Sequence, residues 1–253
     1  MNSSTQVNKP KKLLYSTLAA IFWIAAWWGI AAYIGMEVVL PTPIHVFTRL
    51  CELIVSSEFY TTAAISLFHV LCGFLCGVIV GTLLAFLTHF VAVARYAFSP
   101  LLTVIKSTPV ASFVILALIF IGKNTLPVFI SAIIVIPLVW SNVSAGLESI
   151  DKDLLEVTRL YAFDFKKKLR TLYIPSLKPY FFSALTTALG LAWKSGISAE
   201  VIANSKDSIG NMLNNSKVYL ESADLFAWTI VVIFFSLIFE WLIKLIGKRG
   251  AVK

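Results

Sequence analysis

Two charged residues, Lys194 and Glu200, stand inside an apolar run at about 177–203. A lysine in the hydrocarbon core of a bilayer costs roughly 2.5–3.5 kcal/mol, so we expect Lys194 to face a polar cavity or a partner acid. Ser198 follows Lys194 by one helical turn, and Asn204 stands in the same relation to Glu200, which gives two short polar stripes. These four residues are candidates to line a polar path, which would favour an anionic ligand at Lys194. A structural ion pair or hydrogen bond is the alternative.

A second basic residue, Lys106, opens the sequence Lys-Ser-Thr-Pro inside the run at about 98–122. Because Pro109 has no backbone donor, we expect a kink here, with the hydroxyl of Ser107 or Thr108 bonding the carbonyl that proline frees. Lys106 lies only about 12 Å along this run, so its ammonium can reach back to the membrane surface. Lys106 and Thr108 are further candidates for the polar path.

Enzymatic chemistry finds little support in the sequence. A membrane-embedded hydrolase needs a serine with a histidine base, or paired aspartates within spans, and Ser198 has no obvious histidine partner. A Gly-x4-Gly-Lys-Ser/Thr phosphate loop is absent from the sequence, so the chain is not by itself an ATPase. Cys51, Cys72 and Cys76 do not have metal-ligand spacing and the histidines are scattered, so we predict no metal site.

The composition places the chain in a membrane. Its 253 residues are 58% hydrophobic and 13% charged, with a mean hydropathy of +0.86, which no ordinary soluble domain has. Long uninterrupted apolar runs exclude a barrel, whose strands alternate polar and apolar residues. We expect an all-α integral membrane protein, with a tail at 1–12 and one domain at 13–253. Six transmembrane helices are predicted, at about 13–35, 62–89, 98–122, 125–147, 177–203 and 224–246.

Small residues recur every four positions in the second of these runs. Gly73, Gly77 and Gly81 fall on one helix face, which Ala85 extends. Such a stripe lets two helix backbones approach closely, so we predict a helix-packing surface here rather than a chemical site.

Basic residues are distributed unevenly between the two sides that the six-span arrangement defines. Fifteen fall on the side of the N-terminus, and only Arg49, Lys123, Lys206 and Lys217 fall on the other. Since basic loops remain in the cytoplasm, we expect both termini and the segment at about 148–176 to be cytoplasmic. The net charge of +8 mainly reflects this topology, and we predict no nucleic-acid partner.

This cytoplasmic segment holds the densest charge cluster of the chain. Asp153 as N-cap, with Glu156 three residues later, predicts a short helix. A turn near Ala162 follows, and Asp164 can cap a second, basic helix that Pro175 ends. We therefore expect a helix-turn-helix between the fourth and fifth spans. Its charge alone would equally suit a segment that covers span ends and binds anionic headgroups.

The spacing within the segment resembles the EAA loop of ABC importer permeases. That pattern is Glu-Ala-Ala, three residues, Gly, nine residues, Ile, one residue and Leu-Pro. The corresponding residues here are Glu156-Val157-Thr158, Ala162, Leu172 and Ile174-Pro175. Alanine stands in place of glycine at position 162, where a left-handed turn would cost it about 1 kcal/mol. A shift of the turn onto Phe163 and Asp164 would avoid this cost.

Further landmarks extend the resemblance over nearly the whole chain. They are similar, in the same order, to segments of the nitrate, sulfonate and taurine group of these permeases. They read PTPIHVF at 41–47, SLFHVLCGFLCG at 66–77, KSTPVAS at 106–112, FIG at 120–122 and GLAWKSGISAEVIA at 190–203. His69 stands where that group commonly has arginine, and Lys194 is also unusual, so the sequence leaves the substrate open.

The resemblance implies a type I ABC importer permease fold and a non-catalytic role. In such importers the helix-turn-helix docks on a separate ATPase, whose closure rocks the spans and moves a small solute inward. The coupling residues would be Asp153, Glu156, Thr158, Ala162, Asp164, Leu172 and Pro175.

The resemblance also implies partners in and beside the cell membrane. They are two copies of a cytoplasmic ATPase, an extracytoplasmic substrate-binding protein and a second permease copy. ATP and magnesium would bind to the ATPase and not to this chain. A stand-alone secondary carrier or a channel is the main alternative. Such a protein would need no docking loop and would show an inverted repeat or polar pore rings, and the sequence contains no inverted repeat.

Overall fold

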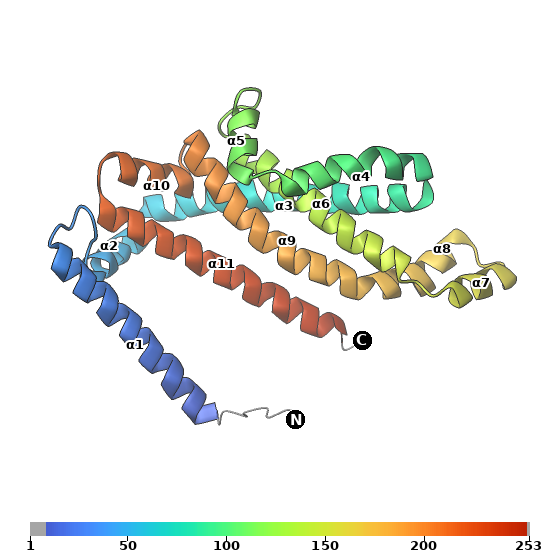
Figure 1. Cartoon of the computed structure of the whole chain (residues 1–253), viewed down its shortest axis with the longest axis horizontal. Coiled ribbons are helices and arrows are strands. Elements are labelled where there is room, and N and C mark those ends of the chain that lie inside the picture. The colour runs from blue at the N-terminus through green and yellow to red at the C-terminus, as the bar shows by residue number, and fades with distance from the viewer. Residues whose placement is uncertain (1–8, 252–253) are drawn as a thin grey trace.

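The computed structural model describes residues 9–251, and within that range short turns connect helices (Figure 1). A π-helical turn at Leu169–Tyr173 joins α8 to α9. The helices are α1 (Lys9–Ile34), α2 (Pro43–Val55), α3 (Ser57–Phe90), α4 (Ala92–Ser107), α5 (Val110–Leu118), α6 (Leu126–Glu148), α7 (Lys152–Leu160), α8 (Phe165–Lys168), α9 (Ile174–Ala203), α10 (Ile209–Val218) and α11 (Ser222–Ala251).

Four helices of the described chain are long and apolar enough to cross a bilayer. These spans are Leu14–Ile34, Ser57–Phe90, Leu126–Glu148 and Ser222–Ile243. The helix α9 is 30 residues long, but prolines, hydroxyl side chains, Lys194 and Glu200 dilute its apolar run. The fold is an all-helical multi-pass membrane protein, and the count of six spans stays a prediction.

The expected third span is broken. The helices α4 and α5 meet at an angle of 105°, so together they form either a sharply bent span or a re-entrant segment. The break lies between Ser107 and Pro109, and the Thr108 hydroxyl donates to the Val104 carbonyl at 2.8 Å. A proline that cannot donate, followed by a new helix start, explains why the chain turns here instead of continuing straight.

The centre of the bundle is the contact of α3 and α9 with α6. The helices α3, α6 and α9 run side by side (Figure 1), and Gly73, Gly77 and Gly81 all face α6. A Cβ atom added to Gly77 would lie 2.6 Å from the Val135 Cβ and 2.8 Å from the Ala132 carbonyl oxygen. The two backbones are thus closer than any side chain at this position would allow.

The helix α1 stands apart from this bundle and meets it near α2 (Figure 1). Most of its apolar side chains are exposed, since only 6% of its spanning window is buried within the chain. The helix begins at Lys9 and so includes the last four residues of the predicted tail at 1–12. Residues 1–8 of that tail lie outside the described range.

Opposite ends of the bundle carry different short helices (Figure 1). One end holds α2 and α10, and the other holds α7 and α8. Side-chain caps fix several of these starts, since Thr42 accepts from the His45 backbone N–H and Ser208 accepts from that of Asn211. If α7 and α8 are cytoplasmic, as the basic residues predict, α2 and α10 face the other side.

Candidate functional site

The first short helix of the charged segment, α7, starts two residues earlier than predicted. Its N-cap is Asp151, whose carboxylate accepts from the Asp153 backbone N–H at 2.9 Å. Asp153 therefore lies in the first turn and is not the cap, which corrects the prediction. Either aspartate can cap a helix, so the local pattern alone could not separate them. Glu156 lies in mid-helix and its side chain is exposed.

Ala162 keeps the left-handed turn, with φ of +47°. The Phe163 N–H donates to the Thr158 carbonyl at 3.0 Å and the Ala162 N–H donates to the Arg159 carbonyl at 3.0 Å. These two bonds form a Schellman-type end to α7, which needs a positive φ at this position. The turn does not shift onto Phe163 and Asp164. The left-handed conformation of Ala162 therefore destabilises the turn by about 1 kcal/mol relative to glycine.

The second helix begins as predicted but does not end as predicted. Asp164 caps α8 by accepting from the Lys167 N–H at 3.1 Å. The chain then continues through the π-helical turn into α9, so Pro175 lies in the first turn of α9 and is no terminator. The π turn shifts the hydrogen-bonding pattern ahead of the proline, whose missing donor is then tolerated. Leu172 is buried.

The α7–α8 segment exposes a row of apolar side chains outside the long helices. They are Leu154, Val157, Leu160, Tyr161 and Phe165, and Leu160 and Tyr161 are 82% and 74% exposed. Thr158 is buried, and its hydroxyl donates to the Leu155 carbonyl at 2.8 Å. A short helix with an apolar outer face next to charged residues has the composition of a protein-binding surface.

Lys194 lines a pocket of about 170 Å³ between α9 and α11. Ser236 and Glu240 lie on the α11 side of this pocket, so polar groups and an acid share the pocket with the lysine. The Ser198 hydroxyl donates to the Lys194 carbonyl at 2.8 Å, within the same helix. This arrangement fits both the path role and the structural role that the sequence left open.

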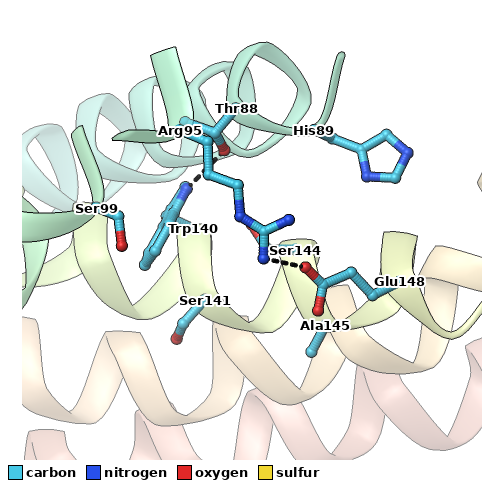
Figure 2. A pocket seen from close by; sticks show the side chains of 9 residues that line it. All are labelled: Thr88, His89, Arg95, Ser99, Trp140, Ser141, Ser144, Ala145 and Glu148. Carbon is cyan, nitrogen blue, oxygen red and sulfur yellow. Dashed lines mark hydrogen bonds and ion pairs between the residues drawn. The ribbon is translucent and has the colours of Figure 1, made fainter. Parts of the chain in front are cut away.

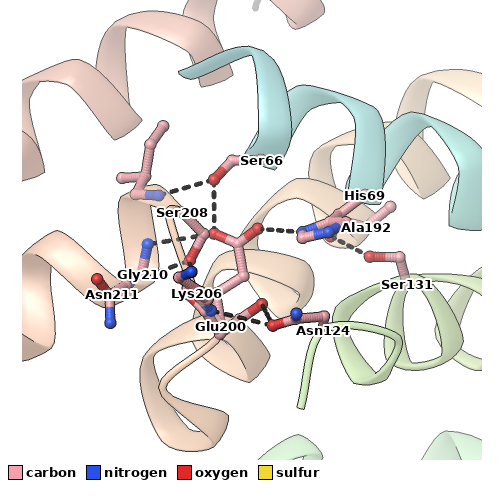
Figure 3. Close-up of polar contacts among 12 residues, drawn as sticks. Ser66, His69, Asn124, Ser131, Ala192, Glu200, Lys206, Ser208, Gly210 and Asn211 are labelled. Atoms are coloured by element: carbon pink, nitrogen blue, oxygen red, sulfur yellow. Dashed lines mark hydrogen bonds and ion pairs between the residues drawn. The ribbon is translucent and has the colours of Figure 1, made fainter. Parts of the chain in front are cut away.

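Glu200 lies elsewhere, in a closed polar cluster where its side chain is completely buried (Figure 3). The Ser66 hydroxyl and the Gly210 N–H donate to one carboxylate oxygen, at 2.7 and 3.1 Å. The other oxygen lies 2.9 Å from the His69 Nδ1. The Ser66 oxygen also accepts from the Ile209 N–H at 2.8 Å, so one carboxylate ties α3, α9 and the start of α10 together.

The predicted path residues do not come together in one place. Asn204 ends α9 in a left-handed conformation, and its side-chain oxygen accepts from the Asn211 amide at 2.6 Å. Lys106 lies on α4, with its Nζ 6.0 Å from the centroid of the Trp140 ring. Thr108 caps α4 at the break. Lys194, Glu200 and Lys106 therefore belong to three separate sites of the chain.

Sequence reasoning missed a pocket of about 220 Å³ where α3, α4 and α6 meet (Figure 2). Arg95 and Glu148 form an ion pair across it, with Nη2 and Oε1 2.7 Å apart. The Trp140 Nε1 donates to the Thr88 hydroxyl oxygen at 2.9 Å. Ser141 and Ser144, three residues apart on α6, were the available signal. The residues that line the pocket are Thr88, His89, Arg95, Ser99, Trp140, Ser141, Ser144, Ala145 and Glu148.

A second missed contact joins α2 to α11 at the opposite end of the molecule. The Arg49 guanidinium donates to the carboxylates of Asp224 and Glu52. The hydrogen bond to Asp224, followed by that to Glu52, raises the pKa of Arg49 above its already high ordinary value. Arg49 and Asp224 are 175 positions apart, so no local pattern connects them.

The long apolar helices, the polar pockets between them and the exposed pair of short helices define a multi-pass membrane protein, and the family match below gives its class as a transport protein. Residues 73–251 match the family model described as "Binding-protein-dependent transport system inner membrane component". The chain belongs to this family and is a permease subunit of an ABC importer, and ATP hydrolysis in such systems lies in a separate subunit.

Two curated relatives illustrate the group. The chain is 23% identical to SsuC of Bacillus subtilis (strain 168), a permease protein named for aliphatic sulfonates, over 98% of this chain and 92% of that protein. It is 28% identical to the nitrate import permease protein NrtB of Synechococcus elongatus, over 79% of this chain and 76% of the other.

A solved structure shares the fold. It belongs to a bacterial alginate ABC transporter in complex with a periplasmic protein that holds an alginate pentasaccharide. The match has a TM-score of 0.63 at 16% identity, over 95% of this chain and 96% of that one.

Proposed function

We propose that this permease subunit moves a small anionic solute into the cell and takes up the energy of ATP hydrolysis through its α7–α8 segment. An ATPase closing against α7 and α8 would move α6 and α9, because α7 follows α6 after three residues and α8 runs into α9. A push at this segment is then transmitted to two of the three helices at the centre of the bundle.

The observation that carries this proposal is the exposed apolar row on α7 and α8. A membrane surface could accept such a row too, but α7 also presents the exposed Glu156 and Asp153, which anionic headgroups would repel. The mixture of apolar and charged side chains of both signs favours a protein groove.

The names of the relatives support an anionic solute and an external binding protein. Sulfonates and nitrate, for which SsuC and NrtB are named, are small oxyanions. The alginate transporter was solved with a periplasmic protein, which supports the same kind of partner here. Such a protein would meet the end that holds α2 and α10. Acidic residues in or next to α2, the starts of α3 and α11, and α10 belong to this end: Glu37, Glu52, Glu58, Asp207, Glu221 and Asp224.

The remaining parts of the assembly are proposed from the family. Two ATPase copies would bind ATP and magnesium, and two permease copies would enclose the path. Both termini would be cytoplasmic, in the inner or plasma membrane. Lys194 and Lys106 stay proposed path residues, since a solute that passes either lysine would gain a favourable charge contact.

Co-purification of the tagged chain with a co-expressed ABC ATPase subunit from the same genome tests the docking role. The variants are Glu156→Lys and Leu160→Asp, and Glu221→Lys at the opposite end is the matched control. Burial of a leucine side chain contributes about 1.5–3 kcal/mol, so Leu160→Asp should weaken ATPase binding about 10- to 100-fold. Substitutions are preferable to a deletion in α8, because α8 is continuous with α9.

We expect both α7 variants to retain much less ATPase and to lower ATP-driven uptake, while the control retains the ATPase. Retention of the ATPase by Leu160→Asp at wild-type affinity would contradict the docking role. A wild-type chain that carries solute without any ATPase would favour a secondary carrier instead.

A further inference from the structure

The pocket between the ends of α3, α4 and α6 has room for a small solute (Figure 2). Its volume is about 220 Å³, whereas one water molecule takes up about 30 Å³ of liquid, and pockets for drug-sized ligands begin at about 300 Å³. Glu148 lines the pocket at the last turn of α6, and α7 begins four residues later, at Lys152. The pocket thus lies on the side from which α7 and α8 project.

The lining supplies hydrogen-bond donors of the kind that oxyanions accept. Figure 2 shows the Arg95 side chain reaching from α4 toward Ser144 and Glu148 on α6. The Ser144 hydroxyl is buried and has no hydrogen-bond partner among the residues that the structure describes. A buried hydroxyl without a partner is destabilising, and a ligand oxygen in the pocket would remove that penalty. Ser99 and Ser141 add two further hydroxyl groups to the lining.

The Arg95–Glu148 ion pair in the pocket is weak enough for another anion to replace Glu148. The side chains of Arg95 and Glu148 are 60% and 54% exposed, and ion pairs with such exposure contribute little to stability. Lys106 follows Arg95 by three helical turns, on the same face of α4, and its Nζ approaches the Trp140 ring that lines the pocket. When Glu148 releases Arg95, the guanidinium becomes available to an anionic ligand in the pocket.

We infer that this pocket binds the oxyanion group of the transported solute, and that Glu148 occupies Arg95 as an internal competitor while the pocket is empty. The incoming anion displaces the Glu148 carboxylate from the guanidinium and takes the Ser144 hydroxyl as a second donor. The anionic class of the ligand rests on the proposed function, but the pocket, the pair and the unpaired hydroxyl do not depend on it.

A purely structural role for the pair predicts a different result from competition. If Arg95 and Glu148 only hold α4 against α6, loss of either residue should have the same effect on a ligand. If Glu148 competes, its removal strengthens anion binding, while removal of Arg95 weakens it. Whether Glu148→Gln strengthens or weakens anion binding therefore distinguishes the two roles.

The experiment measures equilibrium binding of radiolabelled ethanesulfonate to the full chain in lipid nanodiscs. Unlabelled nitrate serves as a competing oxyanion and choline as a cationic control. The variants are Arg95→Gln, Glu148→Gln and the double variant, with Lys123→Gln as the matched control for loss of one positive charge at an exposed site. None of these substitutions leaves a buried charge without its partner, since both members of the pair are more than half exposed.

We expect nitrate, and not choline, to displace ethanesulfonate from the wild-type chain. Arg95→Gln should weaken binding about 10- to 100-fold, because a charge-assisted hydrogen bond is lost. Glu148→Gln should strengthen binding up to about fivefold, in line with the small contribution of an exposed pair. In the double variant the gain from Glu148→Gln should vanish, because the competitor acts through Arg95.

Three results would overturn the inference: no ethanesulfonate bound by the wild type, binding unchanged in Arg95→Gln, or binding weakened in Glu148→Gln. The ATPase co-purification described above is run on the same variants. If Arg95→Gln retains the ATPase and binds ethanesulfonate normally, the pocket assignment fails and the proposed function stands. Anion binding that depends on Arg95 in a chain that retains no ATPase would leave the pocket standing without the proposed function.

Discussion

At the scale of single residues, Glu200 has a structural role that its position inside an apolar run does not reveal. Its carboxylate accepts hydrogen bonds from the Ser66 hydroxyl and the Gly210 N–H, and contacts the His69 ring. A Cβ added to Gly210 would lie 2.2 Å from the Glu200 Cβ, so glycine is required for α10 to start this close to α9. The carboxylate thereby sets the position of α10 at the end opposite α7 and α8.

Replacement of this carboxylate should destabilise the chain. In Glu200→Ala the Gly210 N–H and the Ser66 hydroxyl lose their acceptor, and each buried donor without a partner costs about 1–3 kcal/mol. We therefore expect the free energy of unfolding to fall by more than about 2 kcal/mol, with a lower melting temperature in detergent. Glu58→Ala, on an exposed position of α3, is the control and should change stability by less than about 1 kcal/mol. Equal melting temperatures for the two variants would mean that the cluster contributes no stability.

At the scale of helices, the contact of α3 with α6 depends on glycine. A Cβ at Gly77 would lie 2.6 Å from the Val135 Cβ, whereas nothing lies within 4 Å of a Cβ placed at Gly29 in α1. Gly29→Ala therefore tests helix propensity alone, and Gly77→Ala adds the cost of separating two packed helices.

Only the alanine substitution in the packed contact should be destabilising. Gly77→Ala should destabilise by about 1–3 kcal/mol, because the backbones of α3 and α6 must move apart. Gly29→Ala should be neutral or stabilise by up to about 1 kcal/mol, since alanine favours a helix more than glycine does. Thermal unfolding of both variants in the same detergent gives the comparison. A Gly77→Ala variant as stable as the wild type would show that α6 is not held at this distance.

At the scale of the whole molecule, patterns along one helix predicted more than contacts between helices could. The four-residue spacing of Gly73, Gly77 and Gly81 predicted a packing face, and the structure places α6 against it. Glu200 was placed correctly in a helix, but its partners Ser66 and His69 lie more than 130 positions away in the sequence. Spacing rules describe one helix at a time, so they cannot supply such partners.

Local sequence rules also gave wrong predictions where the structure on either side of a residue determined its conformation. Pro175 was expected to end a helix, but a π-helical turn just before it lets α8 continue into α9. The Arg95–Glu148 pair and its pocket depend on the return of α4 beside α6, which follows from the turn after α3 and not from any motif. The sequence patterns thus predicted apolar helices and the class of protein. The polar sites could not be predicted, because they form only where those helices pack against one another.

The orientation of the molecule is the prediction that connects these scales, because docking on an ATPase requires α7 and α8 to be cytoplasmic. Two single-cysteine chains can test it, both carrying Cys72→Ser and Cys76→Ser. One keeps Cys51, which is exposed on α2, and the other replaces Cys51 with serine and carries Lys166→Cys on the exposed face of α8.

The labelling reagent is a maleimide that cannot cross membranes, applied to intact and to permeabilised spheroplasts. Basic loops remain in the cytoplasm, so we expect Cys51 to react in intact spheroplasts and Lys166→Cys to react only after permeabilisation. Denatured samples of both chains, labelled to completion, control for expression. Labelling of Lys166→Cys in intact spheroplasts would place α7 and α8 outside, where a cytoplasmic ATPase cannot reach Glu156. The docking proposal would then be wrong whatever the co-purification had shown, because the segment that it needs would lie on the other side of the membrane.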